Sequence, residues 1–315
     1  MFRSLCFVFA LSALVSCGQR TSSSGSQAQP AVRQQVFLPP IPPAALSPDE
    51  KRDFLREHYW DRFDFGDTLF VSRADSSRML DAYAQFVAVL SDRPADPAPM
   101  QALMQRASAS RPMLDYFVWL ASQVVADPNS PLRNDEFYIP VLEAQLASPF
   151  YDEYECIGPD YELRLAKQNR VGRPANDFRY TLDSGASGSL YRLKADYVLL
   201  FINNPGCPMC RQIREAIGAS ELLAELIGQG RLKVLAFYPD ENLDEWRAYR
   251  EHIPASWINS YDKGCVVRET SAYDLSAIPA LYLFDRRKRV LVKDATDVAL
   301  VERAIVLNEQ AAAGL

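Results

Sequence analysis

The sequence predicts two folded domains, an all-α domain over residues 47–172 and a domain built on a central mixed β-sheet over residues 173–315. In the first segment, apolar residues recur at the spacing of a helix with one buried face. Two such sets are Leu80, Tyr83, Ala84, Val87 and Leu90, and Met113, Phe117, Leu120 and Val124. In the second segment, strand patterns alternate with helix patterns, which is typical of a sheet covered by helices on both faces.

The all-α segment opens with a strong helix start. Ser47 can cap the helix, Pro48 suits its first position, and Glu50 completes a capping box with Ser47. Stretches such as SDRPADPAP and ADPNSPLRND separate the later helices. The aromatic residues near the start are expected in the core rather than at a ligand: Tyr59, Trp60, Phe63, Phe65 and Phe70. No set of catalytic side chains stands out in this segment.

Between Asn169 and Asp177 the sequence pattern changes from mostly helical to strands that alternate with helices. FRYTL and SLYRL flank a Gly-rich loop and predict a hairpin. Strands are then expected over Tyr197–Ile202, Leu232–Tyr238, Ala280–Asp285 and Arg289–Asp294. Helices are expected over Arg211–Ile227, Leu243–Glu251 and Val298–Leu307.

The charge balance argues against a nucleic-acid partner. The 315-residue chain carries a net charge of −6, whereas binding to phosphates needs a basic surface. The one dense basic run, Arg286 to Arg289, lies between two strand patterns and is expected in a solvated hairpin turn.

The N-terminus predicts export. Arg3 precedes an apolar run from Leu5 to Val15, which is too short for the roughly 20 residues of a membrane span and suits a secretory signal instead. The sequence LVSCG around Cys17 resembles a bacterial lipobox. This resemblance implies a signal peptide over residues 1–16 and a lipid, such as palmitate, on Cys17. It also implies a protein anchored to a membrane, with the outer membrane favoured, and facing the periplasm.

The segment from Cys17 to residue 46 is expected to be a disordered tether. It is rich in Ser, Gln, Ala and Pro, and such a composition buries too little apolar surface to fold. A tether of this kind would hold the folded domains away from the membrane.

Cys207 and Cys210 carry the chemistry that the sequence predicts. A zinc site would need further Cys or His ligands at short spacing, and the chain has only two histidines, far apart. A purely structural disulfide across two residues would constrain the unfolded chain little. In a redox pair, the helix N-terminus would stabilise the Cys207 thiolate, and Cys210 would resolve a mixed disulfide on it. The redox interpretation is favoured, with no metal and no bound cofactor.

Three features resemble the thioredoxin superfamily and, more closely, its TlpA/ResA-like membrane-tethered periplasmic branch. They are the strand YVLLFI, the Cys-Pro-Met-Cys motif at Cys207 to Cys210, and Ile278-Pro279 before the strand ALYLF. The resemblance covers about residues 175–312 and implies a thioredoxin-like fold. It also implies that Pro279 has a cis peptide bond facing the dithiol and that Ile278 and Pro279 dock the substrate. Implied partners are client proteins with disulfides or thiols and an upstream electron-transfer protein.

Departures from the family pattern leave the direction of electron flow open. Gly206 stands where thioredoxins usually have Trp, and Phe201 stands where they have a buried acid. The two residues between the cysteines are Pro and Met, and such residues tune the reduction potential. The branch resemblance alone favours reduction of client disulfides.

The sequence leaves the roles of Cys156 and Cys265 open. They could be unpaired small residues in the interior, a bridge between the two domains, or, for Cys265, a second relay thiol. For the whole chain, the favoured hypothesis is a thiol–disulfide oxidoreductase. The alternative is a non-catalytic binding or assembly lipoprotein on a thioredoxin scaffold. A thiol peroxidase is weaker because no Thr-x-x-Cys motif is present.

Overall fold

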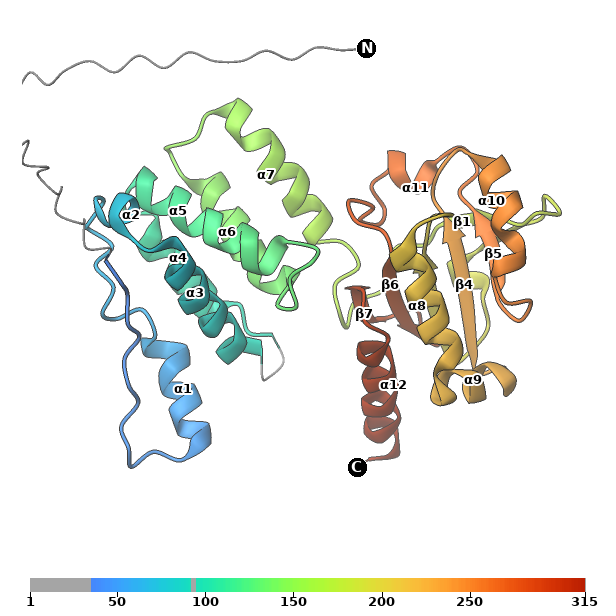
Figure 1. Ribbon diagram of the computed structural model, residues 1–315, viewed down its shortest axis with the longest axis horizontal. Coiled ribbons are helices and arrows are strands. Elements are labelled where there is room, and N and C mark those ends of the chain that lie inside the picture. Colours follow the sequence, from blue (N-terminus) through green and yellow to red (C-terminus); the bar gives the residue numbers. More distant parts are fainter. Residues whose placement is uncertain (1–34, 92–94, 315) are drawn as a thin grey trace, which may run out of the picture.

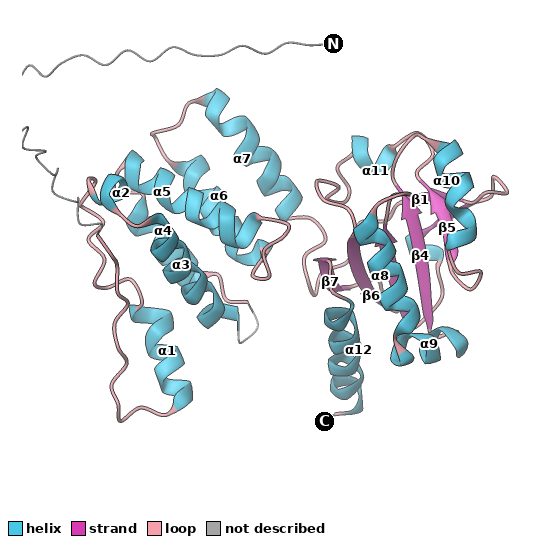
Figure 2. Cartoon of the chain, in the orientation of Figure 1, coloured by secondary structure: helices cyan, strands magenta, loops and turns pink. Residues whose placement is uncertain are grey.

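The computed structural model describes residues 35–91 and 95–314, which form a helical domain followed by a domain with a central sheet (Figures 1 and 2). The helical domain contains α1 (Pro48–His58), α2 (Phe70–Arg73), α3 (Ser76–Ser91), α4 (Ala98–Ala107), α5 (Arg111–Ala121), a π-helical turn (Ser122–Ala126), α6 (Asp135–Ala147) and α7 (Glu153–Ala166). The sheet domain has strands β1 (Arg179–Thr181), β2 (Ser187–Ser189), β3 (Tyr197–Ile202), β4 (Leu232–Tyr238), β5 (Ile258–Tyr261), β6 (Ala280–Asp285) and β7 (Val290–Ala295). Its α-helices are α8 (Pro208–Ala219), α9 (Glu221–Gly228), α10 (Leu243–Tyr249), α11 (Val266–Glu269) and α12 (Val298–Ala313), and 3₁₀ turns cover Leu190–Arg192 and Arg250–His252. None of the helices in the described ranges has the length and apolar character that crossing a membrane requires.

The helical domain has its own aromatic core. The predicted capping box at Ser47 and Glu50 is present at the start of α1. Trp60 packs edge-on against Phe63 and Phe117, and its neighbours Tyr59 and Phe65 are also buried, as expected for core residues. Aromatic side chains in these orientations contribute both apolar burial and favourable ring contacts.

One residue of the predicted tether, Phe37, belongs to this core, which corrects the expectation of disorder at that point, whereas Leu38 and Ile41 beyond it are exposed. Phe37 is buried and stacks on Trp60 with ring centroids 4.8 Å apart. The backbone of Gln35 bonds to Arg73 and Asp75. The composition of the segment is poor in apolar residues overall, but Phe37 packs against the rings of Tyr59, Trp60 and Phe63. The earlier part of the tether and the signal segment lie outside the described residues.

The sheet runs in the order β2-β1-β5-β4-β3-β6-β7 and is mixed. Strands β3, β4 and β5 are parallel, and β6 pairs antiparallel with both β3 and β7. Strand β3 is buried at every position because both faces of the sheet are covered. Leu199 and Phe201 pack on the face covered by α8, α9 and α12, while Val198 and Leu200 pack on the opposite face. The predicted sheet covered by helices is therefore confirmed.

Two of the predicted helices differ from the observed ones by more than a few residues at an end. The expected helix from Arg211 to Ile227 is divided at Ser220, which ends α8 and caps α9 by accepting a hydrogen bond from the Leu223 N–H. Helix α12 continues past Leu307 to Ala313. Both differences arise because apolar periodicity marks a buried face but not the points where a helix stops.

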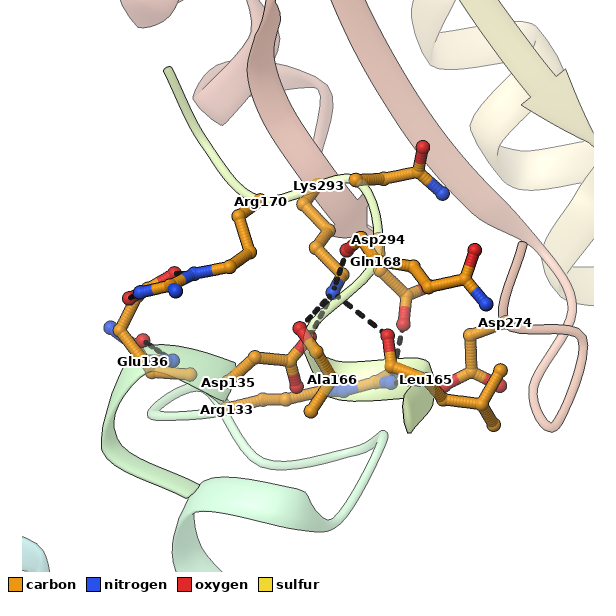
Figure 3. A network of polar contacts seen from close by, with 12 residues as sticks. Arg133, Asp135, Glu136, Leu165, Ala166, Gln168, Arg170, Asp274, Lys293 and Asp294 are labelled. Atoms are coloured by element: carbon orange, nitrogen blue, oxygen red, sulfur yellow. Dashed lines mark hydrogen bonds and ion pairs between the residues drawn. The ribbon is translucent and has the colours of Figure 1, made fainter. Parts of the chain in front are cut away.

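A polar network joins the two domains (Figure 3). Arg133, two residues before α6, forms ion pairs with Asp274 and Asp294 of the sheet domain. Lys293, on β7, forms an ion pair with Asp135. Its ammonium group also donates to carbonyl oxygens at the end of α7 and just beyond it, to Ala166 at 2.9 Å and to Gln168 at 2.6 Å. A cation at this position satisfies carbonyl groups that the helix itself leaves unpaired.

Candidate active site

Cys207 lies at the N-terminus of α8, directly after the loop that follows β3. It is the N-cap residue, and Pro208 occupies the first helical position. Its Sγ accepts a hydrogen bond from the Cys210 backbone N–H at 3.3 Å, and the side chain is only partly buried. The sulfur therefore lies at the N-terminal end of the helix, beside backbone N–H groups that the helix leaves unpaired, and its side chain is accessible in part.

Cys210 lies one turn further along α8 and is only 2% exposed. Burial raises the pKa of the Cys210 thiol to about 12, the Asn204 backbone N–H opposes this rise, and the Cys207 sulfur adds to it. The two sulfurs thus differ sharply in access and environment. In this structure the inner thiol is therefore protonated at neutral pH.

A loop before β6 lies against the outer sulfur. The Ile278–Pro279 peptide bond is cis, as the resemblance implies. The Ile278 carbonyl oxygen is 4.0 Å from the Cys207 Sγ, so sequence positions 71 residues apart meet at one place. The structure therefore brings together all four predicted residues of the sheet domain: Cys207, Cys210, Ile278 and Pro279.

Gly206, which stands where thioredoxins usually have tryptophan, suits the backbone conformation at this position. Its φ is +73°, in the left-handed region that glycine adopts readily. The same loop contains Asn204, a site residue that sequence reasoning missed. Its backbone N–H lies 3.5 Å from the Cys210 Sγ. No side-chain pattern could reveal it because the backbone makes the contact.

The interior beneath the dithiol is apolar. Phe201 is 1% exposed and packs edge-on against Trp257 in the same cluster as Cys210. Phe201 fills the position where the family resemblance leads one to look for an acid. Cys210 therefore has an aromatic ring, and no carboxylate, at that position of the neighbouring strand.

The other predicted sites are distributed elsewhere. The described cysteines form no disulfide with one another, so Cys156 and Cys265 are not bridged in this structure. Cys265 is buried, which raises the pKa of its thiol, whereas Cys156 is only partly buried. Cys17 lies outside the described residues. Within those residues, no group of His, Cys, Asp and Glu side chains is arranged to hold a metal ion.

The mixed sheet, the helix that opens with a dithiol and the cis proline facing it define a thioredoxin-like fold. Residues 16–169 match a family described as a domain of unknown function (DUF5106). No curated protein matches the chain.

Solved structures from Bacteroides species resemble this chain. A thioredoxin-like protein from Bacteroides caccae is 42% identical, with a TM-score of 0.80 over 87% of this chain and 99% of that one. The C-terminal domain of an uncharacterized protein from Bacteroides fragilis is 49% identical over 43% of this chain and 96% of that one, with a TM-score of 0.42. The thioredoxin domain of a thiol-disulfide oxidoreductase from Bacteroides vulgatus is 19% identical over 44% of this chain and 97% of that one, with a TM-score of 0.39.

The match to the Bacteroides caccae protein extends over both domains. This chain belongs to the same family of two-domain thioredoxin-like proteins.

Proposed function

We propose that the protein is a thiol–disulfide oxidoreductase that reduces disulfides of client proteins in the cell envelope. The observation that carries the proposal is the position of the Cys207 sulfur. It caps α8, accepts the Cys210 N–H, and lies 4.0 Å from the carbonyl of Ile278 beside the cis proline. The Cys207 side chain is only partly buried, and the buried thiol of Cys210 lies one helical turn further along α8.

The reaction transfers two electrons from the dithiol to the client. The Cys207 thiolate attacks one sulfur of the client disulfide, so an S–S bond forms to Cys207 while the client's own S–S bond breaks and its second sulfur leaves as a thiolate. Cys210, once deprotonated, then attacks the Cys207 sulfur and releases the first client sulfur. The client gains two electrons and two protons, and Cys207 and Cys210 become a disulfide.

The backbone beside Pro279 would align the client. The Ile278 carbonyl is on the same side as the attacking sulfur, so an extended client segment can pair with the loop while its disulfide reaches Cys207. No bound cofactor takes part, because the dithiol itself carries the electrons. An upstream electron-transfer protein would then reduce the Cys207–Cys210 disulfide back to two thiols.

Attachment to a membrane is part of this proposal. The lipobox-like sequence at Cys17 supports lipidation, and the absence of Asp after Gly18 favours the outer membrane. The stretch between Cys17 and the first packed residues near Gln35 would serve as the tether. Labelling with radioactive palmitate and its loss in Cys17→Ala would test the anchor separately from the redox chemistry.

Trapping of mixed disulfides tests the catalytic part. Cys210→Ala removes the resolving thiol and should leave clients bound covalently to Cys207, while Cys207→Ala should trap none. Complexes would be separated on non-reducing gels and released by a reductant. If the two variants trap equally little and phenotypes follow only deletions in the helical domain, the chain is a binding scaffold and not an oxidoreductase.

A further inference from the structure

Helix α7 presents large apolar side chains to solvent. Ala166 is its only buried residue, whereas Tyr154 is 84%, Ile157 65% and Tyr161 47% exposed. These three residues follow one another at intervals of three and four, so they lie along one face of the helix. We call this the α7 face. An exposed apolar strip of this kind is a candidate interaction site.

The α7 face leads to the sheet domain. The Tyr161 hydroxyl is 3.3 Å from the Ser271 hydroxyl, at the start of the segment that runs to Pro279. Tyr161 and Leu165 also line a cavity of about 480 Å³ between the domains, whose opposite wall includes Asp274 and Ser276. Ser276 is two residues before Ile278, whose carbonyl faces the Cys207 sulfur. The apolar strip and the cavity therefore share Tyr161, and the cavity wall at Ser276 is two residues along the chain from the docking loop.

The interdomain network holds the two walls of this surface in place. Arg133 pairs with Asp274 at 3.0 Å, which fixes the segment before the cis proline. Lys293 binds the carbonyl end of α7 through Ala166 and Gln168, so the helix is anchored to β7 where the face reaches the cavity (Figure 3). A segment bound along α7 would consequently keep a fixed relation to the docking loop.

The cavity also has unneutralised negative charge. Asp127 accepts from the Asn129 backbone N–H, and Glu162 accepts from the Tyr138 hydroxyl. Among the described residues neither carboxylate has a Lys or Arg partner within ion-pair distance, in contrast to Asp274. The surface therefore complements a segment that combines apolar side chains with a positive charge.

We infer that the α7 face and the adjoining cavity bind the polypeptide that flanks a client disulfide, and that this segment is extended, apolar and basic. The inference rests on the proposed function and gives the helical domain a role in it. A polypeptide is favoured over a small disulfide because the proposed binding surface is long. The α7 face alone extends about 10 Å from Tyr161 to Tyr154, at 1.5 Å per residue. A native globular client would bury its apolar residues, so unfolded or partly folded clients fit best.

Two peptides with the same disulfide loop test this inference. One carries leucine and lysine residues beside the loop, and the other carries serine and glycine. The pre-reduced full chain is mixed with each peptide, and the rate of a single turnover is measured by thiol trapping and mass spectrometry. The unaltered protein should react about tenfold faster with the apolar, basic peptide, and this preference should disappear in the double variant Tyr154→Ser/Ile157→Ser. The rate with the serine–glycine peptide should stay unchanged in that variant.

Leu307→Ser supplies a matched control, because Leu307 is 53% exposed on the outer side of α12. It should retain the preference. Equal rates with both peptides in the unaltered protein, or a preference that survives in the double variant, would overturn the inference while leaving the redox function intact. If the unaltered protein reduces neither peptide, the proposed function fails and the client site fails with it. Self-association or vesicle binding that the double variant abolishes, without a peptide preference, would assign the face to a second copy or to lipid and would also overturn the inference.

Discussion

The two sulfurs of the motif differ although only two residues separate them. Cys207 caps the helix and is partly exposed, whereas Cys210 is sealed beneath it. The motif and its position before a helix could be predicted from local sequence, because Cys spacing, the preceding strand and Pro208 all lie in one short stretch. The roles of Asn204 and Gly206 could not, since one acts through its backbone and the other through a positive φ.

This asymmetry predicts selective alkylation. At pH 7, iodoacetamide should modify Cys207 at least about 100-fold faster than Cys210, because burial raises the pKa of Cys210 to about 12 and also blocks the reagent. Modification of Cys210 in a Cys207→Ser variant should still rise with pH on the alkaline side, because burial keeps the pKa of Cys210 raised after the Cys207 sulfur is removed. Peptide mass spectrometry after timed quenching measures both rates, and urea-unfolded protein serves as the control. Equal rates in the folded protein would contradict the assigned roles.

At the scale of elements, the long buried strands were easier to predict than helix ends, whereas the short strand β5 (Ile258–Tyr261) was not predicted. Tyr197–Ile202 has a continuous apolar run because the strand is covered on both faces. The division at Ser220 was missed, since serine is tolerated inside a helix as well as at its start. Its hydroxyl accepts the Leu223 N–H and donates to Glu302 of α12, a contact 82 positions away that no local pattern reveals.

Ser220→Ala should therefore destabilise the sheet domain. The variant loses the cap of α9 and leaves Glu302 without this donor, which should lower the free energy of unfolding by about 1 kcal/mol. Urea unfolding followed by circular dichroism measures the change. Ser220→Thr keeps the hydroxyl and should recover much of the loss. A loss of the same size in both variants would mean that packing, rather than capping, sets the effect.

At the scale of the molecule, the polar contacts between the two domains could not be predicted from the sequence. Arg133 and Asp294 are 161 positions apart, and neither stands out in its own segment. Burial raises the pKa of Asp294 to about 7, with Asp274 and Asp135 adding to the rise and Arg133 and Lys293 opposing it. The network thus contains a carboxyl group whose charge changes near neutral pH.

This carboxyl should make stability depend on pH. Between about pH 4 and 7 the folded protein holds the Asp294 proton more tightly than the unfolded chain, so the free energy of unfolding should fall as the pH rises. The contribution of Asp294 between pH 5 and 8 is roughly 2–3 kcal/mol. Asp294→Asn should remove this part of the slope in urea unfolding curves, with Asp297→Asn as a control at an exposed helix cap. An identical slope in Asp294→Asn and the unaltered protein would place the titration elsewhere.

The central claim is that Cys207 and Cys210 exchange two electrons as a pair. The most direct measurement is a titration of the full chain in glutathione or dithiothreitol buffers of known potential, with alkylation and peptide mapping at each point. We predict a single two-electron transition assigned to a Cys207–Cys210 disulfide, with a midpoint nearer the value of about −270 mV of a reductant than the value of about −120 mV of an oxidant. Two thiols that stay unpaired across this whole range would contradict the claim.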